Sequence, residues 1–180
     1  NKNLFKTKKM NLNQSLPVEW VDIDDPNPKR GKVRGQGHSK GAALFCRGEG
    51  LWLHQHSAYF TATSGGPIGE GQVFKFTPTS KNEGKIEVLC HSVDTYLFER
   101  PDALTVAPNG DVWVAEDNMG INCIRCIKPD GTLHYFAKNV LSKGELSGVC
   151  FDESASTMYV NLQDDGLTFA IRGPFANYQG

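Results

Sequence analysis

A guanidinium and a carboxylate stand two positions apart in the segment Phe45-Cys46-Arg47-Gly48-Glu49-Gly50-Leu51-Trp52. Side chains at this spacing share one face of an extended segment, so Arg47 and Glu49 are expected to project into one space. An arginine fork suits the oxygens of a phosphate group, and a carboxylate suits a hard cation. Taken alone, the two residues favour an ordinary ion pair on a sheet face over a binding site.

The elements that must position these groups repeat along the chain from Ala43 onward. Three segments align, each with an aromatic residue at its third position: 57–63, 111–117 and 157–163. In the first two repeats, further strands are predicted at 72–76 and 85–89, and at 122–127 and 132–136. Four short strands with a period of about 45–55 residues are typical of a propeller blade. The sequence therefore predicts an all-β fold, a β-propeller with four-stranded antiparallel blades.

The repeat divides the chain into two regions. Residues 1–42 are polar, basic and rich in proline, and they are expected to form an irregular N-terminal arm. Residues 43–180 supply about two and a half blades. Propellers close with about four to eight blades, so the chain is expected to be an incomplete portion of a larger propeller, with the missing blades upstream.

Carboxylates recur where the inner strands of such blades would meet around a common axis. Glu49, Asp102 and Glu145 are expected at one position of the repeat, and Glu116-Asp117 end the second strand of the second unit. All five are oxygen donors, which suits calcium or ferric iron rather than zinc. The alternative for Asp102, which follows a proline, is a turn cap.

The composition excludes several other classes of protein. A formal net charge of -1 over 180 residues argues against general nucleic-acid binding, which requires a basic face. No apolar run approaches the roughly 20 residues that span a bilayer, so no membrane span is expected. Cys123-x-x-Cys126 falls in a predicted strand, where positions i and i+3 face opposite ways, and is interpreted as a pair of structural thiols.

Several motifs together resemble the C-terminal part of the PhoX-type alkaline phosphatase family, in order from about residue 17 to residue 175. They are Phe45-x-Arg47-x-Glu49-Gly50, Tyr59-Phe60-Thr61-x-Thr63-Ser64-Gly65-Gly66, Pro101-Asp102-x-Leu104-Thr105-Val106, Ala115-Glu116-Asp117, Glu145-Leu146-Ser147-Gly148 and the ending Thr168-Phe169-Ala170-Ile171-x-Gly173-Pro174. Each motif is weak alone, and the ordered set is specific.

The resemblance implies a metal-dependent phosphatase that hydrolyses phosphate monoesters, built on a six-bladed propeller and located in the periplasm or outside the cell. It implies a small phosphate-ester substrate and a cluster of calcium and iron on the propeller axis. Carried over by motif, Arg47 would hold the substrate phosphate and Glu49 would ligate metal. Asp102, Glu116 and Asp117 are weaker assignments to the same metals.

Two other functions stay open at this stage. A calcium-dependent lactonase of the gluconolactonase-like propellers would share the phrase at 101–115, although neither Arg47 nor the ending at 168–174 is expected there. A non-catalytic propeller that binds partners would have the same repeating pattern of strands. An assay for hydrolysis distinguishes the three functions. A phosphatase hydrolyses a phosphate ester, a lactonase hydrolyses a lactone, and a binding module hydrolyses neither.

Overall fold

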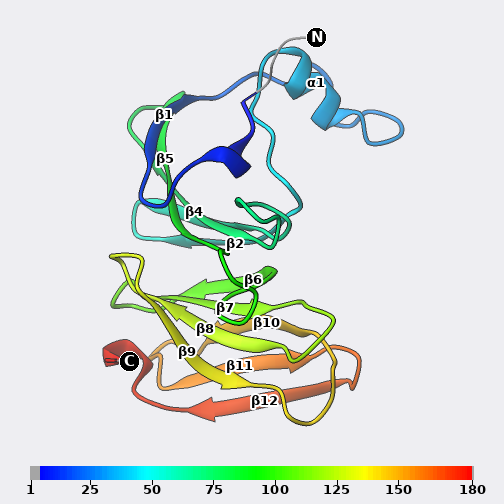
Figure 1. Cartoon of the computed structure of the whole chain (residues 1–180). Helices are drawn as coiled ribbons and strands as arrows, with labels where there is room; N and C mark the ends of the chain where they lie inside the picture. Colours follow the sequence, from blue (N-terminus) through cyan, green and yellow to red (C-terminus); the bar gives the residue numbers. More distant parts are fainter. Residues whose placement is uncertain (1–4, 180) are drawn as a thin grey trace.

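The computed structural model describes residues 5–179, which form three antiparallel sheets stacked face to face (Figure 1). The first sheet has the strand order β1-β5-β4-β3-β2, the second β6-β7-β8-β9 and the third β10-β11-β12. Their bounds are β1 Ser15–Glu19, β2 Gly48–His54, β3 Ser57–Ala62, β4 Gln72–Pro78, β5 Glu83–His91, β6 Pro101–Val106, β7 Val112–Glu116, β8 Cys123–Ile127, β9 Leu133–Lys138, β10 Leu146–Phe151, β11 Thr157–Leu162 and β12 Leu167–Arg172.

Strands β2 to β5 and β6 to β9 each follow one another in up-and-down order, and each strand pairs with the next along the chain. This is the arrangement of a propeller blade, and the prediction of an all-β fold made of antiparallel sheets is confirmed. The described residues supply three strands of a third unit. No helix within residues 5–179 is long and apolar enough to cross a membrane.

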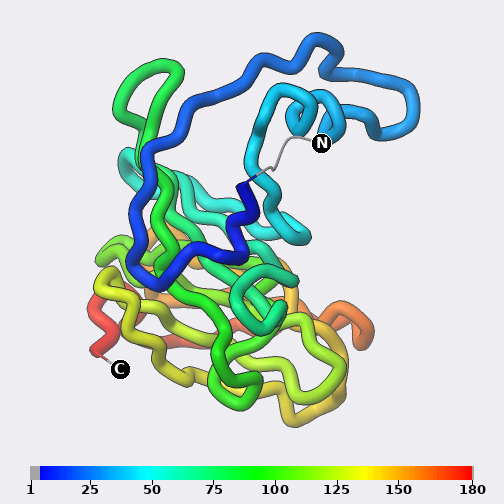
Figure 2. Tube along the Cα trace, turned by 45° about the horizontal axis from the view of Figure 1, so that its top comes forward, coloured from blue at the N-terminus to red at the C-terminus, as the bar shows by residue number. Residues whose placement is uncertain are grey.

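The N-terminal region contains more regular structure than the irregular arm expected for residues 1–42. Strand β1 pairs antiparallel with β5 and extends the first sheet, while η1 (Thr7–Lys9) and α1 (Val33–Ser39) are short helices. The strand forms because Leu16 and Val18 alternate with exposed residues and pack on Phe74 and Ile86. Pro17 concealed this strand in the sequence, but proline is tolerated on a sheet edge. Figure 2 shows that the part of the region after β1 forms a long loop that extends away from the sheets.

Apolar side chains fill the two spaces between the stacked sheets. Trp113 is fully buried between the second and third sheets, together with Leu146, Met158 and Val160. Tyr59, Val73, Leu104 and Val114 are among the residues that fill the space between the first and second sheets. Strands β7 and β8 are buried at every position because the second sheet is covered on both faces.

Candidate active site

The candidate site lies where the inner strands β2, β6 and β10 begin, and Figure 1 shows these strands following one another through the stack. Strands β2 and β6 approach closely at Gly50. A Cβ atom at this position would lie 2.4 Å from the carbonyl oxygen of Asp102, so only glycine fits here. The close approach brings the start of one inner strand against the start of the next.

Arg47 stands immediately before β2 and has a positive φ of 52°. Its Nη2 atom lies 3.6 Å from Oε1 of Glu49 and 3.9 Å from Oδ2 of Asp117. The two side chains from the sequence motif therefore do share one space. The structure adds Asp117, which comes from the neighbouring sheet.

Asp102 lies beside this group and is positioned by Thr63. The buried Thr63 hydroxyl donates a hydrogen bond to the Pro101 carbonyl at 3.0 Å and lies 3.5 Å from Oδ1 of Asp102. The pKa of Asp102 is raised by burial and then by the negative charges of Glu49 and Asp117, while Arg47 and Thr63 oppose the shift. Asp102 therefore lies within the electrostatic reach of all three charged neighbours.

Glu145 joins the same group from the third sheet. Its pKa is raised by burial first and then by the charges of Asp117, Asp102, Asp164 and Glu49. Oε2 of Glu145 accepts a hydrogen bond from Nε2 of Gln163 at 3.1 Å. We refer to Glu49, Asp102, Asp117 and Glu145 as the carboxylate cluster, to which the three stacked sheets all contribute.

The structure corrects the expected equivalence of the carboxylates in the repeat. Equivalent positions of the second strands pair with Gly48 in β2, Pro101 in β6 and Leu146 in β10, and each inner strand has a register shift after this point. This register makes Glu49 and Asp102 equivalent, but their counterpart in the third unit is Ser147. Glu145 comes two positions earlier, so it reaches the cluster from a different point of its sheet.

Glu116 lies apart from the carboxylate cluster, although the sequence placed it with the metal ligands. Its carboxylate is buried and accepts hydrogen bonds from Nε of Arg125 at 3.0 Å and from the backbone N–H of Glu99 at 3.2 Å. Neighbouring residues of a strand face opposite ways, so Asp117 and Glu116 separate. Burial raises the pKa of Glu116, and the Arg125 charge opposes that shift.

The cluster fits a hard cation by donor type and by charge. Two of its carboxylates, Glu49 and Asp117, lie 3.6 Å and 3.9 Å from the Arg47 guanidinium. The mutual repulsion that raises the pKa of Asp102 and of Glu145 would be relieved by a cation. Within residues 5–179 no three His, Cys, Asp or Glu side chains are arranged closely enough to hold a metal ion. In the arrangement described, the carboxylates of the cluster are therefore too far apart for three of them to hold one ion.

The cysteines of the Cys123-x-x-Cys126 motif are ill suited to this chemistry. Cys123 and Cys126 are buried in β8, and burial raises their pKa values to about 11 and about 12. All five cysteines of the described chain are free thiols. A buried thiol with a raised pKa is a poor nucleophile and a poor metal ligand, which agrees with the structural role expected for the pair.

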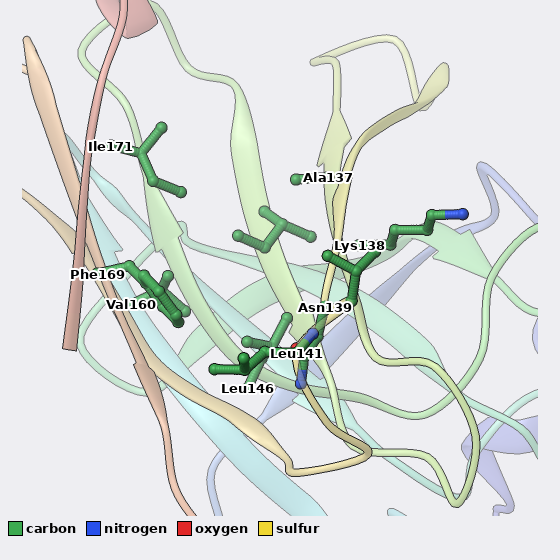
Figure 3. A pocket seen from close by; sticks show the side chains of 10 residues that line it. Ala137, Lys138, Asn139, Leu141, Leu146, Val160, Phe169 and Ile171 are labelled. Carbon is green, nitrogen blue, oxygen red and sulfur yellow. The ribbon is translucent and has the colours of Figure 1, made fainter. Parts of the chain in front are cut away.

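A separate cavity of about 310 Å³ opens between the second and third sheets (Figure 3). It is lined largely by apolar side chains, among them Leu141, Leu146, Val160, Phe169 and Ile171. Figure 3 shows the Lys138 side chain directed away from these groups. None of the clustered carboxylates lines this cavity, so the charged site and the apolar cavity are distinct.

Comparison with known proteins identifies the family. The family described as "Alkaline phosphatase PhoX" matches residues 4–166, which is most of the chain. No curated protein matches the sequence significantly. Among solved structures, the gluconolactonase XC5397 from Xanthomonas campestris is similar, with 18% identity and a TM-score of 0.47 over 66% of this chain and 36% of that one. The chain thus spans about a third of that protein, and by its family match it belongs to the PhoX alkaline phosphatase family.

Proposed function

We propose that this chain is part of a metal-dependent phosphatase that hydrolyses phosphate monoesters, and that it contributes Arg47 and the carboxylate cluster to the active site. The observation that carries the proposal is the convergence of one guanidinium and four carboxylates from three successive sheets. Membership of the PhoX family supports the same activity.

The arrangement suits a phosphate dianion only when cations separate it from the carboxylates. Glu49, Asp102, Asp117 and Glu145 would hold the calcium and iron that the family resemblance implies, and Glu116 is left out because Arg125 pairs with it. When bound, such metals neutralise the phosphate and polarise it for attack. Arg47 orients the ester through a bidentate fork, and Thr63 fixes the segment that bears Asp102.

We also propose that further blades complete a six-bladed propeller and that they lie upstream in the polypeptide. Leu51 and Leu53 support this proposal, since these residues on one face of β2 are 63% and 72% exposed. A large exposed apolar face is typical of a surface that another element covers. The proposed location in the periplasm or outside the cell rests on the family resemblance alone.

The decisive experiment measures hydrolysis of p-nitrophenyl phosphate by the whole protein, supplied with calcium and iron, before and after Glu49→Gln. We expect the substitution to lower kcat/KM by about 100-fold or more, because an amide is a weak ligand for a hard cation. Glu153→Gln, in an exposed turn of the third sheet, is the matched control and should change nothing. Full activity of the Glu49 variant would remove this residue from the site.

The same preparation tests the second candidate, a calcium-dependent lactonase. The sequence motif at 101–115, which spans β6 and most of β7, favours a lactonase because the same motif occurs in gluconolactonase-like propellers. Hydrolysis of gluconolactone without hydrolysis of the phosphate ester would replace the phosphatase proposal. A protein that hydrolyses neither compound would be a binding module.

A further inference from the structure

Two arginines occupy equivalent positions in neighbouring sheets. Arg47 immediately precedes β2 and Arg100 immediately precedes β6, and both have a positive φ, of 52° and 42°. The carbonyl of Arg47 accepts a hydrogen bond from Thr63 N at 2.8 Å, and that of Arg100 accepts one from Asp117 N at 2.9 Å. The residues are therefore related by the repeat in backbone conformation, in register and in hydrogen bonding.

A closed series of contacts connects the two arginines. Thr63 donates its backbone N–H to Arg47 and its hydroxyl to the carbonyl of Pro101, the residue after Arg100. Asp117 donates its backbone N–H to Arg100, and its carboxylate lies 3.9 Å from Nη2 of Arg47. Asp117 thus contacts Arg47 through its carboxylate and Arg100 through its backbone N–H, which places Arg100 beside one member of the carboxylate cluster.

The side chain of Arg100 is anchored at one nitrogen only. Its Nε donates to Oε2 of Glu70 at 3.0 Å, and its backbone N–H donates to the Glu70 carbonyl at 2.6 Å. Within the described residues, the two terminal amino groups of Arg100 make no hydrogen bond, and its side chain is 37% exposed. Glu70 therefore fixes the direction of the guanidinium and leaves its outer edge available.

We infer that Arg100 is a second phosphate-binding arginine, which holds the same dianion as Arg47 from the neighbouring sheet. This inference rests on the proposed phosphatase function. Two guanidinium groups match the double charge of a phosphate monoester, whereas a phosphate diester has one negative charge. Arg100 accordingly favours monoesters over diesters as substrates.

The test is calorimetric titration of inorganic phosphate into the whole protein, loaded with calcium and iron. Arg47→Gln and Arg100→Gln should each raise the Kd for inorganic phosphate by about tenfold, since each removes a charge-assisted hydrogen bond. Glu70→Gln keeps the guanidinium and should raise the Kd by less than about threefold. Arg172→Gln, at the opposite end of the third sheet, is the control and should leave it unchanged.

A purely structural ion pair between Arg100 and Glu70 would give a different pattern. In that case Arg100→Gln and Glu70→Gln would lower the melting temperature alike, and neither would alter the Kd for inorganic phosphate. An unchanged Kd for Arg100→Gln beside a raised Kd for Arg47→Gln overturns the inference and leaves the proposed function standing. If the unaltered protein binds no phosphate, the proposed function fails as well.

Substrate choice and a conservative variant give two further readouts. The ratio of kcat/KM for p-nitrophenyl phosphate over bis-p-nitrophenyl phosphate should fall in Arg100→Gln, because only the monoester gains from a second guanidinium. Should the glutamine variant fail to fold, Arg100→Lys retains the charge beside Glu70 but loses the fork. This variant should still raise the Kd several-fold, and an unchanged Kd would contradict the inference.

Discussion

At the scale of the residue, the carboxylate cluster places like charges together at the cost of stability. Asp102 and Glu145 both have raised pKa values, because burial and neighbouring carboxylates disfavour their charged forms. Arg47 offsets part of this repulsion through Glu49 and Asp117. Groups that destabilise the fold yet converge on one place are typical of a binding site.

This repulsion predicts how the metal-free protein responds to pH. The folded state binds protons at Asp102 and Glu145 more tightly than the unfolded state does, so their contribution makes the free energy of unfolding fall as pH rises through the raised pKa values. Asp102→Asn should reduce that fall and raise the melting temperature at neutral pH by about 2 °C. Thermal unfolding followed across a pH series measures both effects.

The control for this experiment is Asp22→Asn, an exposed aspartate in the N-terminal region, which should leave the pH profile unchanged. Calcium should also raise the melting temperature of the unaltered protein more than that of the Asp102 variant. A variant that is less stable at neutral pH, with calcium stabilisation intact, would show that Asp102 has a structural role instead.

At the scale of the element, the site depends on how closely β2 approaches β6. Thr61 and Thr63 donate hydroxyl hydrogen bonds to the carbonyls of Asp102 and Pro101, and Gly50 leaves the space for this contact. The first two sheets are thereby fixed to each other at the point where Arg47 and Asp102 emerge. Local backbone packing thus positions the charged groups.

Gly50→Ala and Gly48→Ala form a matched pair that tests this contact. A Cβ at Gly50 would lie 2.4 Å from the Asp102 carbonyl oxygen, whereas a Cβ at Gly48 meets only the Thr61 carbonyl oxygen at 4.0 Å. Gly50→Ala should lower the free energy of unfolding by about 2–4 kcal/mol, and Gly48→Ala by less than about 1 kcal/mol. Urea denaturation compares them, and equal losses would contradict the packing argument.

At the scale of the whole molecule, the C-terminal segment joins the second and third sheets. Phe175, in the short helix η2 (Phe175–Asn177), is buried with its ring 5.2 Å from Trp113 and 5.2 Å from Phe151. Lys128 on the second sheet also donates a hydrogen bond to the Tyr178 carbonyl. These contacts tie the segment that follows β12 back to the aromatic core between the two sheets.

Phe175→Ala should therefore destabilise the protein by about 3–5 kcal/mol, the usual cost of removing a fully buried phenylalanine ring. Tyr96→Ala removes a ring that is 90% exposed and should cost less than about 0.5 kcal/mol. Chemical denaturation monitored by tryptophan fluorescence suits the measurement, because Trp113 contacts the deleted ring. A loss below 1 kcal/mol would mean that the segment does not hold the sheets together.

Much of the fold could be predicted from the sequence because strand signals are local. The aromatic markers at Tyr59, Trp113 and Tyr159 all fall in second strands, and the ends of the predicted strands differ from the observed ends by at most two residues. Strand β1 was missed because Pro17 interrupts its pattern. A proline is compatible with an edge strand, and edge position is a property of the assembled sheet.

The candidate site, like the fold, could be predicted from the sequence only in part. The sequence by itself determined the repeat, the pairing of Arg47 with Glu49 and the family motifs, since all three depend on spacing along one strand. Only the tertiary structure decided that Asp117 joins Arg47, that Glu116 pairs with Arg125 and that Ser147, not Glu145, is the counterpart of Asp102. These outcomes depend on the bulge in each inner strand and on contacts between sheets, because one inserted residue reverses the face that every later side chain occupies.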